Sequence, residues 1–197
     1  MPHLELLRHD HAGGLLTFER ENRAYFAASI PDRGDDFFAR FDARLEALLA
    51  EQEAGICFFH VVVDDEGDVV GRVNLIDAAA GSAELGYRIA ERAAGRGLAT
   101  ASVREVCVLA SRTYGLTSLT ARTTLDNAGS RAVLTRAGFV VTSEIRLTGR
   151  PGLAFVRDRM PQRIACLIRN RDAVSEYLDT VSRTHSTSPT PQASPAP

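Results

Sequence analysis

The spacing of apolar residues predicts helices and strands in the first half of the chain. Apolar positions at helical spacing predict one helix over residues 10–28 and a second over residues 35–53, which Gly55 ends as a C-terminal cap. Short apolar runs predict strands over residues 3–8, 56–64 and 68–76. The turn residues Asp65-Glu66-Gly67 separate the last two strands, which indicates a hairpin.

The second half of the chain predicts strands and helices in alternation. A strand begins at Glu84 and a strongly periodic helix ends near Tyr114. A strand over residues 118–124, a helix that begins at Asn127 and a strand over residues 139–147 follow. This order, after an antiparallel start, predicts an α/β fold of the α+β type: a mixed, partly antiparallel sheet with helices on both faces.

Two alternatives remain open after the turn at residues 149–152. One places the last strand over residues 163–169, and the other places a strand over residues 153–157 and a helix from residue 162. Residues 172–183 then predict a short helix, and residues 184–197, rich in Ser, Thr and Pro, bury too little apolar surface to fold. We therefore expect one domain over residues 1–183 and a disordered tail over residues 184–197.

Composition narrows the possible functions. With 197 residues, of which 45% are hydrophobic and 24% charged, the chain can form one sizeable core. The formal net charge of −2 provides no broad basic surface, so we expect no nucleic-acid partner. No apolar run approaches the ~20 residues of a membrane span and no export signal is present, so we expect a cytoplasmic protein without a membrane partner. The widely separated cysteines indicate buried thiols in a reducing compartment; they are Cys57, Cys107 and Cys166.

Other polar residues favour structural roles. His60 lies in an apolar run, which favours a hydrogen-bonded core histidine over a base in a pocket. Asn74 either lines an amine pocket or faces solvent. No Cys or acid completes a metal site with the histidines near the start of the chain, so we expect no metal cofactor; they are His3, His9 and His11.

A glycine turn between a strand and a helix carries the clearest chemical signal. Gly95 and Gly97 follow the strand that begins at Glu84 and precede the periodic helix. The unpaired amide N–H groups of a first helical turn, together with the positive end of the helix dipole, bind phosphate, and glycine allows close approach of the backbone. This unit therefore predicts a site for a phosphorylated ligand.

The spacing distinguishes this turn from other phosphate loops. It lacks the Gly-Lys-Ser/Thr ending of a nucleotide triphosphate loop. A dinucleotide-binding turn has a third glycine where this chain has Thr100, and no acidic residue follows at a suitable distance. A nicotinamide-dependent oxidoreductase is therefore a minor alternative.

Three motifs resemble one family. Arg92-x-x-Gly95-x-Gly97 resembles the pyrophosphate loop of the GNAT N-acetyltransferase superfamily. The helix that begins Asn127-x-x-Ser130 and ends in Gly138-Phe139 is similar to the helix that marks its RimJ/RimL-like ribosomal-protein branch. Residues 21–26 are similar to that branch's first-helix signature, although Ser29-Ile30-Pro31 replaces the usual Trp-x-Pro. The resemblance covers roughly residues 3–169.

The resemblance implies a GNAT fold that binds acetyl-CoA as co-substrate. The strand that begins at Glu84 would carry a bulge and part from the strand over residues 118–124, and the pantetheine arm would lie between them. The arm would pair with the backbone near Arg88, Ile89 and Ala90. The pyrophosphate would lie over the glycine turn, where Arg96 and Arg92 would add charge, unless Arg92 is a plain loop residue. The turn comprises Gly95, Arg96, Gly97, Leu98, Ala99 and Thr100.

The resemblance also implies catalytic roles, each with a structural alternative. Glu84 would deprotonate the acceptor amine through water, or would form a salt bridge at the strand edge. Ser130 would protonate the departing thiolate, with Tyr87 as a substitute, or would cap its helix. Asn127 would bind the pantetheine arm, cap the helix that follows, or do both.

These residues predict an N-acetyltransferase that works by direct attack within a ternary complex. The acceptor would be an amine, either a protein or peptide N-terminal α-amine or a small molecule. The alternative is a non-catalytic acyl-CoA sensor or interaction module. A homodimer is a further expectation, because the helix over residues 172–183 presents an apolar side.

Overall fold

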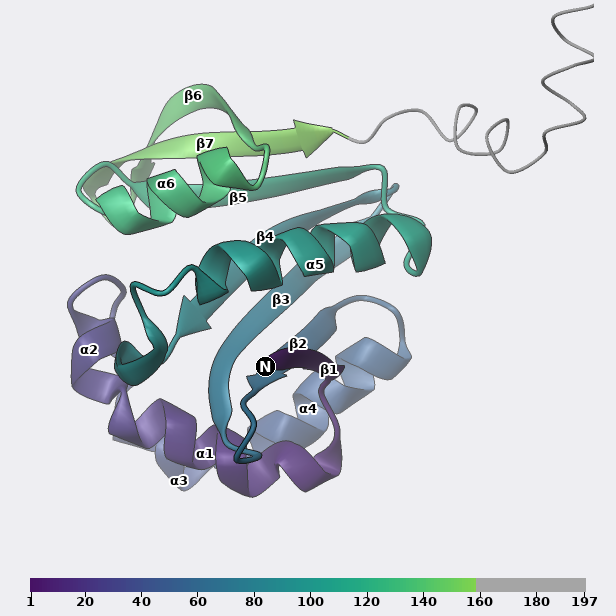
Figure 1. Cartoon of the computed structure of the whole chain (residues 1–197), viewed down its shortest axis with the longest axis vertical. Helices are drawn as coiled ribbons and strands as arrows, with labels where there is room; N and C mark the ends of the chain where they lie inside the picture. Colours follow the sequence, from purple (N-terminus) through teal and green to yellow (C-terminus); the bar gives the residue numbers. More distant parts are fainter. Residues whose placement is uncertain (159–197) are drawn as a thin grey trace, which may run out of the picture. The chain divides into compact units, whose positions relative to one another are not determined.

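A mixed sheet forms the centre of the computed structural model, which describes residues 1–158 (Figure 1). Its seven strands have the order β1-β2-β3-β4-β5-β7-β6. Neighbouring strands are antiparallel except β4 and β5, which are parallel. The strands are β1 (His3–Leu6), β2 (Phe58–Val63), β3 (Val69–Ala79), β4 (Ser82–Ile89), β5 (Ser118–Thr124), β6 (Val140–Leu147) and β7 (Arg150–Asp158). The predicted mixed α/β sheet is confirmed.

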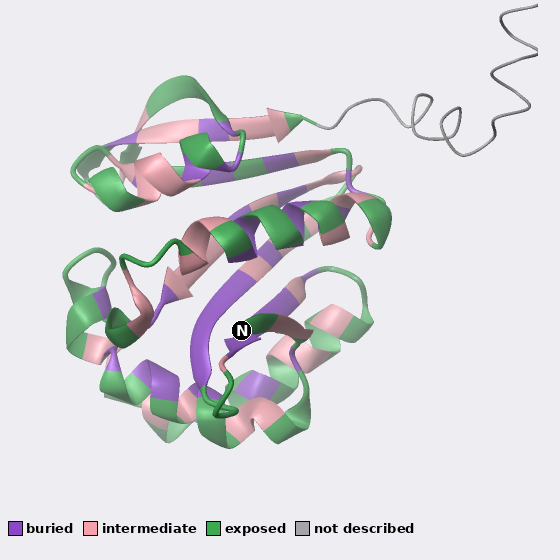
Figure 2. Cartoon of the chain, in the orientation of Figure 1, coloured by how far each residue is buried: buried purple, intermediate pink, exposed green. Residues whose placement is uncertain are grey.

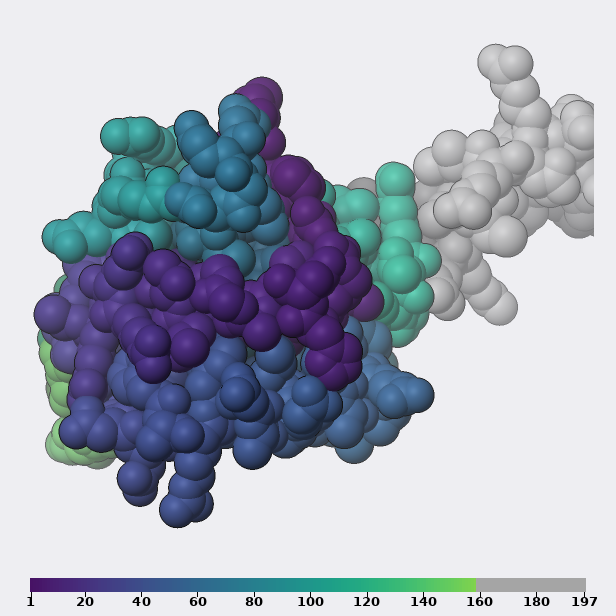
Figure 3. Space-filling model, turned by 90° about the horizontal axis from the view of Figure 1, so that it is seen from below, coloured from purple at the N-terminus to yellow at the C-terminus, as the bar shows by residue number. Residues whose placement is uncertain are grey.

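Helices cover both faces of this sheet. Figure 3 shows the side covered by the N-terminal helices, drawn in purple and blue. These are α1 (Ala12–Glu21), α2 (Arg23–Ala27), α3 (Asp35–Ala39) and α4 (Phe41–Glu53). The opposite face carries α5 (Leu98–Arg112) and α6 (Ala128–Arg136), and the 3-10 turns η1 (His9–His11) and η2 (Glu91–Ala93) complete the set. None of the helices within residues 1–158 has the length and apolar character needed to cross a membrane.

Two hydrophobic cores lie on the two faces of the sheet. Val73 and Leu75 of β3 pack with the buried side of α5, whereas Val61 and Val63 of β2 pack with the N-terminal helices. Because side chains alternate along a strand, β2 and β3 contribute to both cores, and β3 is buried along most of its length (Figure 2). The apolar residues predicted for the second helix do enter the core; Phe37, Phe41 and Leu45 are buried.

The two long helices predicted for the N-terminal region are wrong in extent, because each is broken. The first ends at Asn22, whose side-chain Nδ2 donates to the Phe18 carbonyl oxygen at 2.9 Å and whose Oδ1 accepts from the Glu91 amide at 2.9 Å. Asparagine side chains compete with the helix for backbone groups in this way. The second predicted helix breaks at Arg40, and across this break Phe37 and Phe41 meet edge to face at 6.1 Å.

The structure supports one of the two alternatives for the end of the chain. Strand β7 spans Arg150–Asp158 and pairs with both β5 and β6, so the strand of the second alternative is present. Several expectations lie outside the described residues: the strand over residues 163–169, the helices from residues 162 and 172, Cys166 and the tail over residues 184–197.

His60 is a hydrogen-bonded core residue, as predicted. Its ring is buried, with Nδ1 3.1 Å from the Val73 carbonyl oxygen and Nε2 2.8 Å from the Tyr114 hydroxyl. A carbonyl only accepts, so Nδ1 carries the hydrogen and Nε2 accepts from Tyr114. The neutral ring is therefore fully satisfied, and burial lowers the pKa of His60.

We expect the free energy of unfolding to decrease as the pH falls below about 6.5. The folded-state pKa of His60 is lower than its unfolded value of 6.5, so the stability contributed by the neutral ring is complete above pH 6.5 and is lost as the pH falls toward the folded-state pKa. One proton changes the free energy by at most about 1.4 kcal/mol per pH unit. Urea unfolding between pH 8 and 5.5 measures the slope. His60→Gln keeps both hydrogen bonds without titrating and should flatten it; equal slopes would contradict the assignment.

Candidate functional site

Strands β4 and β5 part from each other next to a large cavity. They pair only from Ser82↔Ser118 to Glu84↔Thr120. Beyond Glu84, β4 pairs with β3 alone up to Ile89, and β5 pairs with β7 alone up to Thr124. Each strand therefore has one edge of backbone N–H and C=O groups that no neighbouring strand uses, and such an edge can hydrogen-bond an extended ligand.

The cavity beside this opening has a volume of about 680 Å³. It brings together most of the predicted site residues from four separate elements. Those that line it are Glu84, Tyr87, Arg88, Ile89, Gly95, Gly97, Leu98, Ala99, Thr100, Asn127 and Ser130. Three predicted residues do not line it: Ala90, Arg92 and Arg96.

The glycine turn has the geometry of an anion cradle. Gly95 and Gly97 have φ angles of +75° and +82°, in the left-handed region that other residues rarely adopt. Gly97 is the N-cap of α5, and the first turn of this helix contains no acidic residue. The free N–H groups of that turn lie at the cavity, where the helix dipole adds positive potential.

The two arginines of this loop lie outside the cavity lining. Arg92 is paired at 3.1 Å with both Asp64 and Asp68 of the β2–β3 hairpin, so the structure favours its alternative as a loop residue. Arg96 is exposed and has no hydrogen-bond or ion-pair partner within residues 1–158. Ala90 is buried, and its amide donates to the Val70 carbonyl oxygen at 2.8 Å.

Asn127 caps the helix on the other side of the opening. Its Oδ1 accepts from the Ser130 amide at 2.9 Å, which is the predicted N-cap. Its Nδ2 has no partner among the described residues, and the residue lines the cavity. The capping bond thus fixes the side chain while the amide hydrogens stay available to a ligand.

A hydrogen bond between Tyr87 and Ser130 spans the opening from β4 to α6. The Tyr87 hydroxyl donates to Ser130 Oγ at 3.1 Å. Burial raises the pKa of Tyr87, and the bond to Ser130 opposes the shift only in part, so the phenol stays protonated at neutral pH. Because a serine hydroxyl both donates and accepts, the hydrogen of Ser130 remains free for a third group.

Glu84 forms an ion pair with Arg122 where the two strands part. Arg122 donates from Nε to Oε1 at 3.0 Å and from Nη2 to Oε2 at 2.6 Å, and Glu84 raises the pKa of Arg122. The salt bridge foreseen as the alternative role of Glu84 is therefore present. Each carboxylate oxygen keeps a second lone pair for a further donor.

The expected bulge lies on a different strand from the one predicted. From Glu84 to Ile89, β4 pairs with β3 in unbroken register, and the irregularity falls on β3 between Ile76 and Ala79. The extra residue is accommodated by Asp77, which has a φ of +54°, and the Ala78 amide donates to the Ile56 carbonyl oxygen at 2.7 Å. A bulge increases the local twist, which here occurs beside the point where β4 leaves β5.

A buried charge cluster on the α1 face was missed by the sequence analysis. Glu19 of α1 accepts from Arg72 of β3 and from Arg88 of β4, both at 2.9 Å. Arg33 lies 3.9 Å from the same carboxylate. An arginine within the apolar run of β3, at a position that faces a core, was the available signal. We call these four residues the Glu19 cluster.

Asn74 lies beside the Glu19 cluster and lines the cavity. Its Oδ1 is buried and has no hydrogen-bond partner among the described residues. The structure therefore supports the prediction that Asn74 lines a pocket, and the solvent-facing alternative is wrong. An acceptor atom left unpaired inside a protein is costly unless a ligand or water provides a donor.

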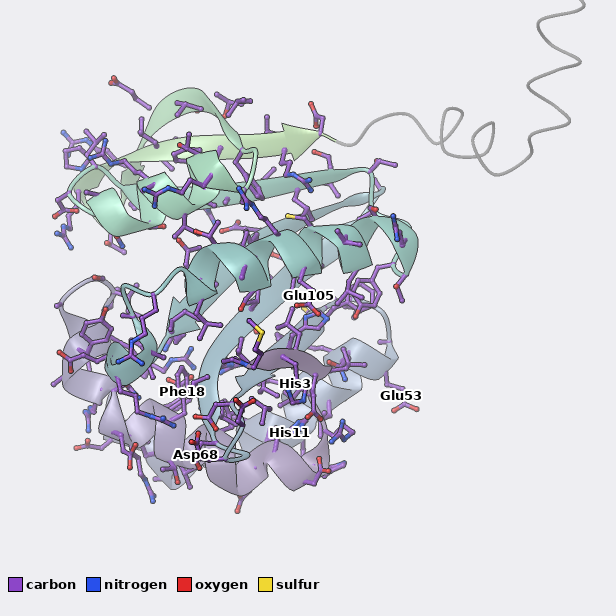
Figure 4. All side chains as sticks on the ribbon, in the orientation of Figure 1. His3, His11, Phe18, Glu53, Asp68 and Glu105 are labelled. Carbon is purple, nitrogen blue, oxygen red and sulfur yellow. The ribbon has the colours of Figure 1, made fainter. Side chains whose placement is uncertain are left out.

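Each of the three N-terminal histidines lies close to a glutamate side chain. His3 and His11, both labelled in Figure 4, each approach Glu5 through Nε2, at 3.0 and 3.3 Å. His9 lies 3.3 Å from Glu46. Within residues 1–158, no group of three or more His, Cys, Asp and Glu side chains is placed to hold a metal ion.

The fold and the cavity define an acetyltransferase of the GNAT class. The sequence profile of the Acetyltransferase (GNAT) domain matches residues 3–140, and the chain belongs to this family. A search of curated protein sequences found no match.

Solved structures of several acetyltransferases share the fold. Ribosomal-protein-S5-alanine acetyltransferase from Vibrio fischeri is 20% identical, with a TM-score of 0.76 over 80% of this chain and 93% of that one. RimJ from Mycobacterium smegmatis, in complex with CoA-disulfide, is 23% identical, with a TM-score of 0.71 over 80% and 81%. Spermidine N-acetyltransferase from Vibrio cholerae, in complex with CoA and spermine, is 16% identical, with a TM-score of 0.68 over 80% and 95%.

We expect Gly97→Ala to weaken CoA binding. Alanine at a left-handed position costs ~1 kcal/mol, and relief of this strain would displace the first N–H groups of α5. Gly115→Ala is the matched control, because Gly115 also has a positive φ of +68°, no atom lies within 4 Å of its added Cβ, and it is absent from the cavity wall. Both variants should lose similar stability in thermal unfolding, whereas only Gly97→Ala should lose CoA affinity in calorimetry. Equal affinities would show that the turn does not bind the pyrophosphate.

Proposed function

We propose that this chain is an N-acetyltransferase that moves the acetyl group of acetyl-CoA to a primary amine by direct attack within a ternary complex. One observation carries the proposal: the unpaired edge of β4, the N-terminus of α5 and the Tyr87–Ser130 pair all border the same cavity. The family to which the chain belongs supports it, as do the CoA complexes of RimJ and spermidine N-acetyltransferase.

The residues around the opening fit the parts of CoA. The free N–H groups that follow Gly97 bind the pyrophosphate, and the edge of β4 near Arg88 and Ile89 pairs with the amides of the pantetheine arm. The Nδ2 of Asn127 donates to the same arm from the opposite wall. Acetyl-CoA supplies an activated thioester, and the protein's task is to orient it and to control protons.

Ser130 and Tyr87 form a donor chain toward the thiolate that leaves. The Ser130 hydroxyl gives its hydrogen to the sulfur, while the Tyr87 hydroxyl donates to Ser130 Oγ and makes this oxygen a better donor. The raised pKa of Tyr87 keeps that donor protonated through the neutral range. Tyr87 thus acts through Ser130 as a positioning residue.

Glu84 receives the proton of the attacking amine through a water molecule. It lies on the face of β4 that also carries Arg88, and Arg122 holds both of its oxygens in place. Its free lone pairs accept from the amine or from that water. Removal of the amine proton leaves the nitrogen lone pair available to attack the thioester carbon.

The acceptor is a protein or peptide N-terminal α-amine or a small-molecule amine in the cytoplasm. The Vibrio fischeri neighbour is an acetyltransferase for an alanine of a ribosomal protein, and the Vibrio cholerae neighbour one for spermidine. These two acceptors differ in charge as well as size, so the choice between such classes depends on the charges of this chain's own cavity. Homodimer formation stays a prediction.

We expect Ser130→Ala to lower kcat about 100- to 10,000-fold, since a general acid contributes on that order. Its affinity for acetyl-CoA should change little. Tyr87→Phe should lower kcat less, and it should have no further effect in the Ser130→Ala background, because Tyr87 acts only through Ser130. Initial rates of thiol release, followed with a thiol-reactive dye, give kcat for each variant.

Ser111→Ala, on α5 outside the cavity wall, is the control and should keep full activity. Independent, multiplicative losses from the two substitutions would refute the donor chain. Tight acetyl-CoA binding without thiol release from a broad panel of amines would refute the proposed transfer and support the non-catalytic sensor.

A further inference from the structure

The Glu19 cluster carries more positive than negative charge. Glu19 faces three guanidinium groups, those of Arg72, Arg88 and Arg33. Three positive charges and one negative charge leave an excess of two. Glu19 and Arg72 are buried, with side chains 2% and 4% exposed, and the Arg88 side chain is only 19% exposed. The Arg33 side chain is 33% exposed, so water screens the charges of Arg72 and Arg88 poorly and that of Arg33 better.

Such an excess is unfavourable without a further anion. Burial, followed by the charge of Arg88, lowers the pKa of Arg33 to about 10, and burial lowers the pKa of Arg88 as well. Within residues 1–158, no carboxylate other than Glu19 lies within 4.0 Å of these three arginines. Asp32 and Asp35 instead engage Arg23 at the exposed rim.

The cluster opens into the acceptor side of the cavity. Arg72 and Arg88 line the cavity together with Asn74 and Glu84. Because successive side chains on β4 point to opposite faces, Arg88 lies on the α1 face, whereas Tyr87 reaches Ser130 on the α6 face. Arg33 and Arg88 also line an adjoining recess of about 10 Å³, with room for about one water-sized group.

We propose that the acceptor carries a carboxylate close to the amine that is acetylated, and that Arg88, Arg72 and Arg33 bind this carboxylate. The inference rests on the proposed transfer reaction. The carboxylate supplies the missing negative charge, and guanidinium groups bind carboxylates with strong, charge-assisted hydrogen bonds. The unpaired Oδ1 of Asn74 then accepts a hydrogen from the amine. A polyamine would meet like charges here and is excluded as a good acceptor.

Two sources can supply this chemistry, an acidic residue next to a peptide's N-terminus or the carboxylate of a free amino acid. The test therefore uses two matched pairs of acceptors. One pair is a C-terminally amidated, otherwise uncharged hexapeptide that begins Ala-Asp or Ala-Asn. The other is alanine and alaninamide, and spermidine is the cationic comparison.

Two readouts apply to every acceptor. Thiol release from acetyl-CoA gives kcat and KM, and calorimetry with CoA in place of acetyl-CoA gives the affinity of the non-reacting ternary complex. We expect the carboxylate member of at least one pair to have about tenfold lower KM and Kd than its amide partner, as a charge-assisted hydrogen bond provides. Preference in the peptide pair identifies a protein N-terminus, and preference in the alanine pair identifies a small molecule.

Variants test whether the cluster causes the preference. Arg88→Gln leaves Glu19 paired with Arg72, so the fold is retained, and it should reduce the preference to less than about threefold. Arg88→Lys should restore it in part. Arg33→Gln should weaken the preference, whereas Arg44→Gln should not. Arg44 is the matched control because both arginines lie over the Phe37 ring, at 4.4 and 5.5 Å, but only Arg33 lies near Glu19 and lines the recess.

Three results would overturn the inference. Thiol release with equal KM for both members of each pair would support the transfer reaction and refute recognition of a carboxylate. Weaker CoA binding by Arg88→Gln, with unchanged acceptor KM, would assign the positive charge to the phosphates of CoA. If acetyl-CoA binds but no acceptor binds and none causes thiol release, the proposed function itself is refuted.

Discussion

The short parallel pairing between β4 and β5 is the constraint on which the site depends. The two strands share pairing only from Ser82 to Glu84 on β4, yet each remains hydrogen-bonded to its outer neighbour. The sheet therefore stays continuous while two inner edges become free. The bulge at Asp77 and the ion pair between Glu84 and Arg122 both lie where the pairing ends. Continued pairing would close the opening and separate α6 from the residues it meets on β4.

Alternation along β4 gives the two faces of this opening different chemistry. Tyr87 contributes a neutral hydroxyl to one face, and its neighbour Arg88 contributes a positive charge to the other. The two substrates of a transferase can thus be recognised independently by adjacent residues of one strand. The cost is a buried like-charge pair, since Arg72 and Arg88 lie opposite each other in the register and need Glu19 between them.

Local signals made much of the site predictable from sequence. The positive φ angles of Gly95 and Gly97 and the capping bond of Asn127 each involve residues only a few positions apart, and residue type alone suggests them. The Glu19 cluster was not predictable, because it joins residues 53 and 69 positions apart. The helix break at Asn22 depends in part on the distant Glu91 amide. The bulge was predicted on β4 instead of β3, because the sequence does not show which of two paired strands takes the extra residue.

Asn22 also limits how this fold can vary. Its side chain must donate to the Phe18 carbonyl and accept from the Glu91 amide at the same time. Aspartate has no hydrogen to donate when ionised, serine is too short to make two divergent bonds, and apolar residues make neither. A chain with another residue here must end its first helix differently and must fasten the start of its glycine turn by another contact. Position 22 therefore couples the end of α1 to the start of the glycine turn.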